Sequence, residues 1–134
     1  MDTTRLQEAI RAARESKGLS QRQAAALAGV TQTQQRRAET DVARVSLHYV
    51  EDICSPLGIH FKIDGHYDHA GMMNAIRRKR ESRDLGMLEL GRILKDDDNG
   101  MVNVWSIETD IAKRTLRVLI LVTDYLGLDF SFSH

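Results

Sequence analysis

The chain has 134 residues, enough for one domain or two very small ones, and its 19 Lys and Arg side chains equal its 19 Asp and Glu side chains, so the formal net charge is zero. Neutrality excludes a histone-like polybasic protein and an acidic tail protein, and it weakens any general attraction of the whole chain to nucleic acid. A hydrophobic share of 42% beside a charged share of 28% is typical of a globular protein and excludes intrinsic disorder.

Helical periodicity and capping residues predict four helices and a strand in the first half of the chain. Leu6 and Ile10 follow the helical period of the first helix, which Gly18 is positioned to end. Ser20 is a good N-cap for the second helix, and Gln23 can complete a capping box. The remaining elements are a third helix over 32–39 capped by Thr31, a fourth helix over 47–57 capped by Ser46, and a half-buried strand over 59–63.

The second half of the chain repeats the pattern of the first. Three blocks recur in the same order, namely 10–19 as 76–85, 39–43 as 108–112, and 57–61 as 126–130. The offset grows by three residues after the first block, and we expect the extra residues in a turn near the aspartates at 96–98. The repeat predicts two homologous units over 1–64 and 72–134, each ending in a short strand, joined by a polar linker over 65–71 with a glycine at each end.

Two short helices separated by a tight turn form the clearest motif. Its residues are Ser20 and Gln21 opening one helix, Ala24 at the helix crossing, Gly29 and Val30 at the turn, Thr31 and Gln32 opening the next helix, and Glu39 near its end. Two helices that cross steeply need a small residue at the crossing and a glycine at the turn. The motif resembles the helix-turn-helix of the lambda-repressor/Cro (Xre) family, and the resemblance covers about residues 6–57.

The resemblance implies that the helix over 32–39 docks in the major groove of DNA with its first residues toward the base edges. Gln can pair with adenine, Arg with guanine, and a threonine methyl group can contact thymine. The expected DNA-binding residues are Thr31, Gln32, Thr33, Arg36 and Arg37 on or beside this helix, with Gln21, Arg22 and Arg44 at phosphates. Gln35 departs from the family, which usually has an apolar residue there, so its side chain either packs poorly or bonds a neighbour.

The end of the first unit, residues 46–63, resembles antitoxins that partner HipA-type kinase toxins, in which two subunits pair their terminal strands across a two-fold axis. A lone strand needs a partner edge. The strand over 59–63 can pair with residues 128–132 of the same chain as a pseudo-dimer, or with a second copy as a homodimer. A higher assembly is favoured because one helix in one groove rarely gives enough affinity. The residues expected at the strand interface are Ile59, Phe61, Phe130 and Phe132.

The counterpart of the reading helix in the second unit, over 101–108, has lost its polar face. Met101, Val102 and Trp105 stand where the first unit has its polar and cationic reading residues, and the aspartates at 96–98 precede them, where they would repel phosphates. This apolar face is either buried against the chain or another copy of it, or it is a docking surface for a partner protein with Trp105 and Met101 as anchors. Burial is favoured because core residues are commoner than docking residues.

The expected fold is therefore mainly all-α, with two tandem lambda-repressor-like units whose terminal strands can form a small antiparallel sheet. The expected function is a sequence-specific DNA-binding transcriptional regulator that reads double-stranded DNA with the helix over 32–39. The alternative is a protein-interaction module, an antitoxin or antiactivator, whose second unit binds a partner protein. No catalytic set, cofactor motif or metal site stands out, so an enzyme is not expected. One cysteine, no signal-peptide core and no run long enough to span a bilayer indicate a cytoplasmic protein. The family resemblance implies a bacterial or phage-borne protein associated with the nucleoid.

Overall fold

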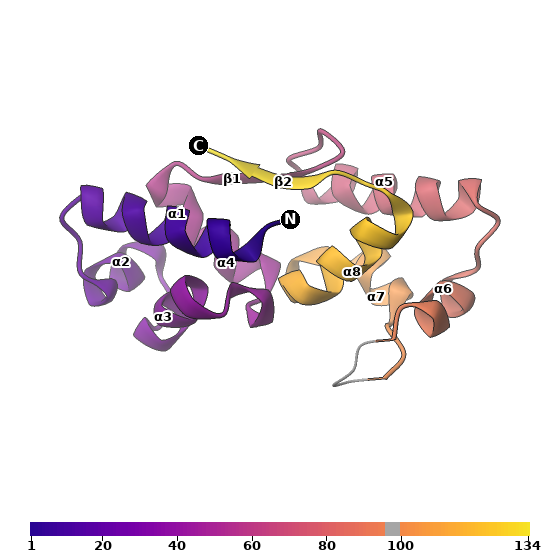
Figure 1. Cartoon of the computed structure of the whole chain (residues 1–134), viewed down its shortest axis with the longest axis horizontal. Coiled ribbons are helices and arrows are strands. Elements are labelled where there is room, and N and C mark those ends of the chain that lie inside the picture. The colour runs from indigo at the N-terminus through magenta and orange to yellow at the C-terminus, as the bar shows by residue number, and fades with distance from the viewer. Residues whose placement is uncertain (96–99) are drawn as a thin grey trace.

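The computed structural model describes residues 1–95 and 100–134, and these residues form a mainly helical fold with one two-stranded antiparallel sheet, which confirms the predicted fold class (Figure 1). The first half contains α1 (Thr3–Ser16), α2 (Gln21–Ala28), α3 (Gln32–Thr40), α4 (Leu47–Cys54) and β1 (His60–Ile63), with 3-10 turns at Val42–Arg44 and Ser55–Leu57. The second half contains α5 (His69–Ser82), α6 (Met87–Ile93), α7 (Val104–Thr109), α8 (Leu116–Leu126) and β2 (Phe130–Ser133), with a 3-10 turn at Ile111–Lys113.

The helix ends of the first half follow from local hydrogen bonding. The Ser20 hydroxyl accepts a hydrogen bond from the Gln23 backbone N–H (3.1 Å), and the Gln23 side chain accepts one from the Ser20 N–H (2.9 Å), so the predicted capping box is confirmed. The fourth helix is shorter than predicted, because α4 ends at Cys54 and the chain continues as the 3-10 turn. Pro56 in that turn has no N–H for a further α-helical bond.

The strands β1 and β2 pair with each other inside the chain, as the pseudo-dimer alternative predicts. Phe61 lies opposite Phe132, and Ile63 lies opposite Phe130, in an antiparallel register. Ile59, Phe61 and Phe130 are buried, and Phe132 is partly buried against the core. The pairing that the homodimer alternative assigns to a second copy is thus made within one chain.

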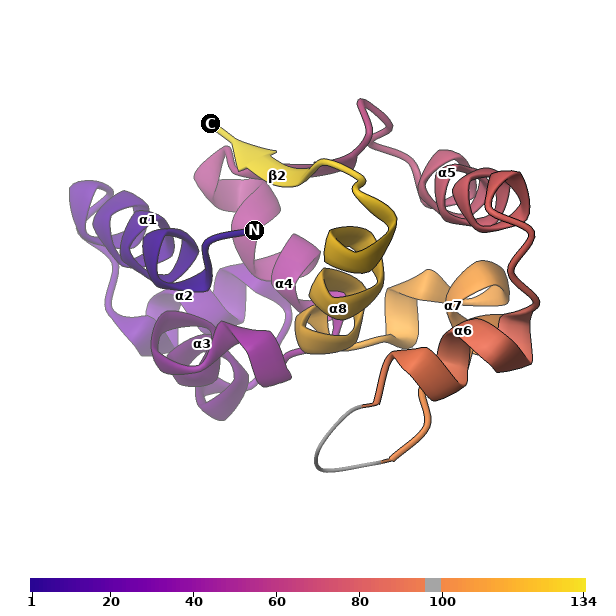
Figure 2. The same cartoon turned by 45° about the vertical axis from the view of Figure 1, so that its right-hand side comes forward.

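A second set of backbone contacts relates the two halves by an approximate two-fold rotation. The Leu47 N–H donates to the Arg114 carbonyl oxygen (2.9 Å), and the Leu116 N–H donates to the Val45 carbonyl oxygen (3.0 Å). Leu47 and Leu116 both begin the last helix of their half, so the two bonds exchange under the rotation. Figures 1 and 2 show α2 and α3 of one half and α6 and α7 of the other on the side of the molecule away from the strands.

One hydrophobic core runs through both halves. It includes Ile10 and Leu47 from the first half and Ile76 and Leu116 from the second, all fully buried. Because these side chains belong to one continuous cluster, each half covers apolar surface that the other would expose.

Two helices begin at other residues than predicted, because side-chain caps set their starts. The linker predicted over 65–71 ends early, since the Asp68 side chain caps α5 and this helix begins at His69. The helix predicted over 101–108 begins late, at Val104, because the Asn103 side chain caps α7. Consequently α7 has six residues, against nine in α3.

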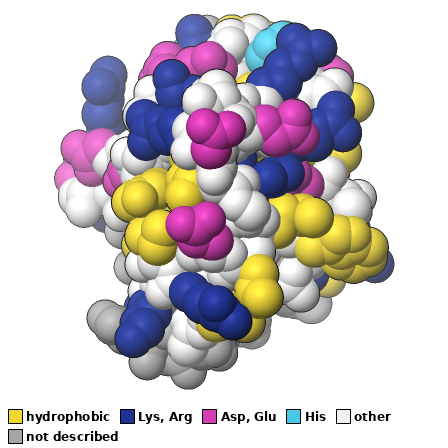
Figure 3. Space-filling view, turned by 90° about the vertical axis from the view of Figure 1, so that its right-hand side faces the viewer, with side chains coloured by type: hydrophobic (Ala, Val, Ile, Leu, Met, Phe, Trp, Pro, Cys, Tyr) yellow, Lys and Arg dark blue, Asp and Glu magenta, His cyan; other side chains and the backbone are white. Residues whose placement is uncertain are grey.

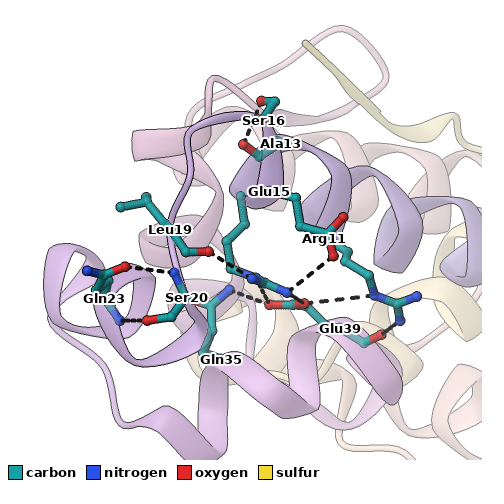
Figure 4. Close-up of polar contacts among 10 residues, drawn as sticks. Arg11, Ala13, Glu15, Ser16, Leu19, Ser20, Gln23, Gln35 and Glu39 are labelled. Atoms are coloured by element: carbon teal, nitrogen blue, oxygen red, sulfur yellow. Dashed lines mark hydrogen bonds and ion pairs between the residues drawn. The ribbon is translucent and has the colours of Figure 1, made fainter.

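A buried arginine–glutamate pair fastens the first helix of each half to the third. Arg14 on α1 donates two hydrogen bonds to the Glu39 carboxylate on α3, at 2.9 and 2.8 Å (Figure 4). Arg80 on α5 donates two to the Glu108 carboxylate on α7, at 2.7 and 2.9 Å. Each arginine also donates to a backbone carbonyl just before the next helix. The two-bond geometry fixes the angle as well as the distance between the helices.

The charge of Glu39 is stabilised in the folded protein. Burial opposes its ionisation and is the largest single influence on its pKa, but hydrogen bonds from the side chains of Arg14, Gln35 and Gln21 together outweigh burial and lower the pKa. A carboxyl whose folded pKa is lowered adds stability above its ordinary pKa of about 4.3, and this stability is lost as the pH falls through the folded pKa.

We expect Glu39→Gln to lower the free energy of unfolding by about 3 kcal/mol at neutral pH, because it leaves the largely buried Arg14 guanidinium with only the exposed Glu15 carboxylate, at 3.8 Å, as a counter-charge. The variant should also lose part of the acid-dependent fall in stability below pH about 4.3. Urea unfolding followed by circular dichroism between neutral and acid pH measures both. Glu8→Gln, at an exposed position of α1, is the matched control and should leave both unchanged. Equal stability of the two variants would contradict the role given to the pair.

The second prediction concerns the contact between α6 and the segment that leads into α7. The Val102 N–H donates to the Gly91 carbonyl oxygen (3.0 Å), and a Cβ on Gly91 would overlap the Val102 carbonyl oxygen. Gly91→Ala should therefore lower the free energy of unfolding by about 1–3 kcal/mol. Gly86→Ala adds a methyl group in open space and should cost less than about 1 kcal/mol, so urea midpoints that coincide for the two variants would refute the close approach.

Candidate nucleic-acid interface

The turn between α2 and α3 is built from a glycine and a capping threonine. Gly29 follows α2 with a φ of +72°, a left-handed conformation that glycine adopts without strain. The Thr31 hydroxyl then accepts a hydrogen bond from the Gln34 N–H (3.2 Å), and the Gln34 side chain accepts one from the Thr31 N–H (3.0 Å). This second capping box sets the start of α3 and hence the residues of its first turn. Buried Ala24 lets the two helices approach closely.

Opposite faces of α3 are buried and exposed. Ala38 and Glu39 lie on the buried face, and Arg36 and Arg37 lie on the exposed one. Neither of these arginines enters an ion pair within the part of the chain that the structure describes, so their guanidinium groups are open to a ligand in solvent. The predicted reading residues that the structure places together on the exposed side are Gln32, Thr33, Arg36 and Arg37, with Thr31 at the helix start.

Gln35 bonds a neighbour, which was one of the two outcomes expected for it. Its side chain is fully buried, and its Nε2 donates to Glu39 Oε2 (2.9 Å). The residue therefore joins the Arg14–Glu39 pair and helps to fix α3 on the core, as an apolar residue would at that position. Figure 4 shows Glu39 receiving bonds from both sides, with Gln35 from its own helix.

The three residues predicted at phosphates lie in different surroundings. Arg22 is exposed on α2. Arg44 is also exposed, and its Nε lies 3.2 Å from the Asp41 carboxylate, an ion pair that a phosphate would have to replace. Gln21 is half-buried, and its side chain helps to lower the pKa of Glu39. A phosphate at the start of α2 would then meet the backbone N–H groups of that helix.

The second half carries an exposed apolar hollow where the first half carries its polar face. Met101 and Trp105 have 51% and 62% of their surface exposed, whereas Val102 is buried. Burial within the chain is therefore found for Val102 and not for Met101 and Trp105, while burial of these two against another copy stays a prediction. Met101 and Trp105 correspond to Gln32 and Arg36, which are also exposed, so the second half has the same exposed face with apolar side chains on it. The hollow has a volume of about 500 Å³, and Met87 and Leu88 of α6 form its opposite wall.

Sequence reasoning overlooked Leu88 as part of this surface. Aligning α6 with α2 places Met87 and Leu88 at the positions of Gln21 and Arg22, and this was the available signal. Figure 3 shows hydrophobic side chains in separate groups at mid-height on this end of the molecule, with charged side chains above, between and below them. The aspartates at 96–98, predicted to repel a phosphate backbone here, lie outside the described residues.

Comparison with known proteins finds a match in the first half of the chain. Residues 10–63 match the family model described as helix-turn-helix. Neither the curated proteins nor the solved structures yield a match to the chain. Within residues 1–95 and 100–134, no helix combines the length and hydropathy needed to cross a membrane. The match spans the last part of α1 through β1, including both capping boxes and the exposed face of α3. The match identifies residues 10–63 as a helix-turn-helix domain of the Xre/lambda-repressor-like kind, which supports a DNA-binding regulator in general.

Proposed function

We propose that this protein is a sequence-specific transcriptional regulator that reads the major groove of DNA with α3. The observation that carries the proposal is the exposed polar face of α3, which combines amide, hydroxyl and guanidinium groups at the start of a helix held firmly on the core. An α-helix fits the major groove, where these groups can distinguish base pairs.

The roles follow from side-chain chemistry and position. Gln32 and Arg37 contact base edges, where Gln32 hydrogen-bonds adenine and Arg37 hydrogen-bonds guanine. The Thr33 methyl group contacts a thymine methyl. Arg36 lies beside them, and Thr31 positions the first turn. Arg22, Arg44 and the start of α2 at Gln21 contact phosphates and set the register of the helix on the duplex.

We further propose that residues 1–64 and 72–134 are duplicated units, of which the first alone reads bases. Supporting this, the Arg14–Glu39 and Arg80–Glu108 pairs hold equivalent helices. The second unit has a shorter third helix and an apolar surface in place of the polar one. A chain with one reading head recognises an asymmetric site, whereas a symmetric homodimer recognises a palindrome.

A second candidate function, a protein-interaction module of the antitoxin or antiactivator kind, is favoured by the exposure of Met101 and Trp105. Large exposed apolar side chains around a hollow are typical of protein-binding surfaces. The two functions are compatible, because the surfaces lie on different halves of the chain.

Selection from a random duplex pool tests the reading residues. The wild-type protein should enrich one short, asymmetric sequence, and Arg37→Ala should bind that sequence more weakly by about 1–3 kcal/mol and lose preference at one base pair. Arg78→Ala, at an exposed arginine of α5, is the control and should enrich the same sequence as the wild type. The assignment of α3 fails if no sequence enriches, or if Arg37→Ala behaves like the control.

Salt dependence tests the phosphate contacts. The logarithm of the binding constant should fall linearly with the logarithm of salt concentration, and Arg22→Ala should reduce the slope by about 1 while leaving the selected sequence unchanged. The molar mass of the protein–DNA complex, measured with the same duplex, should correspond to one 15.2 kDa chain per site. Two chains on a palindrome would instead support the homodimer.

A further inference from the structure

The apolar hollow between α6 and α7 lies where a symmetric two-fold molecule would carry its second reading head. The rotation that exchanges the Leu47–Arg114 and Leu116–Val45 bonds relates the first half, with its reading face, to the second half. Figures 1 and 2 show α6 and α7 on the side that α3 also occupies. A straight duplex that receives α3 therefore continues past the hollow.

We propose that this hollow binds one amphipathic helix of a partner protein, and that this helix and DNA passing beneath the second unit exclude each other. The walls are the exposed side chains of Met87, Leu88, Met101 and Trp105, and the floor includes buried Val102. A volume of about 500 Å³ lies within the range of about 300–1,000 Å³ typical of occupied binding sites. Several apolar side chains from one face of a helix would fill it, as in the helix-in-groove mode of recognition.

A second copy of this chain is the other obvious occupant, and shape and area argue against it. A two-fold contact places the same patch against itself, so two hollows would face each other and enclose a void. The four exposed walls are also too few. A large side chain buries about 150–250 Å² when fully covered, and these are about half exposed, whereas a stable interface needs about 800 Å² per partner. A single convex helix fits the shape of one hollow, and as a transient partner it needs less area than a stable interface.

The chemistry of the walls suits a helix with large aliphatic or aromatic residues. Met87 and Met101 have flexible, polarisable side chains that adapt to the shape of a neighbour. Trp105, 62% exposed, supplies the large rigid surface that is common at the centre of protein interfaces. Anchors at positions i, i+3 or i+4, and i+7 of the partner helix would reach the hollow from one face.

The exclusion of DNA rests on the proposed function of α3 and follows from size. An α-helix with its side chains is about 10–12 Å across, so one seated in the hollow stands out toward the duplex that α3 holds. Within the described residues, the second unit has exposed Met101 and Trp105 where the first has Gln32 and Arg36, so it lacks their polar groups to hold that duplex in return. A partner helix would thereby release the protein from DNA that continues under the second unit. Binding to DNA that ends after the first half-site would be unaffected.

The docking part is tested with a display library of helical peptides about 15 residues long, randomised at i, i+3, i+4 and i+7 on an Ala, Glu and Lys background. The wild-type protein should enrich peptides with apolar residues at these positions, and Met101→Glu should weaken their binding about tenfold or more. Leu27→Glu, a matched change at an exposed leucine of α2, should leave peptide binding unchanged. Because Trp105 is the single tryptophan, docking should shift the fluorescence to shorter wavelength.

Several results would overturn the docking proposal. These are a failure to enrich apolar peptides, equal binding by Met101→Glu, or a Trp105 emission unaffected by the enriched peptide. A fluorescence shift of the protein alone with rising concentration, together with a doubled molar mass, would assign the hollow to a second copy. Circular dichroism of both Glu variants checks that they fold.

The exclusion of DNA is tested with two duplexes that share the selected sequence. One ends after the half-site, and the other continues for about 10 base pairs beneath the second unit. The enriched peptide should weaken binding of the longer duplex at least tenfold and leave the shorter one unchanged. An equal effect on both, or none on either, would overturn the exclusion. If neither duplex binds in the absence of peptide, the proposed function of α3 fails, and the peptide result stands separately.

Discussion

The pairing of the two halves around an approximate two-fold axis is the constraint on which the rest of the structure depends. The strands β1 and β2 are each four residues long, and a strand of that length is not stable without a partner edge. Their pairing, together with the reciprocal bonds at Leu47 and Leu116, closes one continuous hydrophobic core. It therefore also decides which surfaces of the second half share a side with α3.

The two halves are alike in their interiors and differ in their exposed surfaces. Inside, the Arg14–Glu39 and Arg80–Glu108 pairs have the same hydrogen-bond pattern and hold the same helices together. Outside, a polar helix face in one half corresponds to an apolar hollow in the other. The fold of a helix-turn-helix unit is thus set by buried contacts that leave its exposed face free to take another chemistry.

The zero net charge and the difference between the two surfaces together bear on the affinity for DNA. A neutral chain gains little from general attraction to the phosphate backbone, so under the proposed function affinity for DNA would depend on a few specific contacts from the first half. One reading head makes fewer such contacts than two. A modest affinity for DNA makes regulation by a competing partner effective, because a partner needs little free energy to displace it.

The sequence by itself determined the local features. Ser20 sets where α2 begins, and Gly29 and Thr31 set where α2 ends and α3 begins. Helical periodicity separated the exposed Arg37 from the buried Glu39, because these effects act within a few residues. The sequence also allowed the pairing of β1 with β2, but it equally allowed each strand to pair with a second copy of the chain. The tertiary structure decided that the pairing lies within the chain, that α7 starts late, that Arg14 bonds Glu39, and that Trp105 is exposed. Each of these depends on which distant segments pack on a residue, and periodicity within one segment does not contain that information.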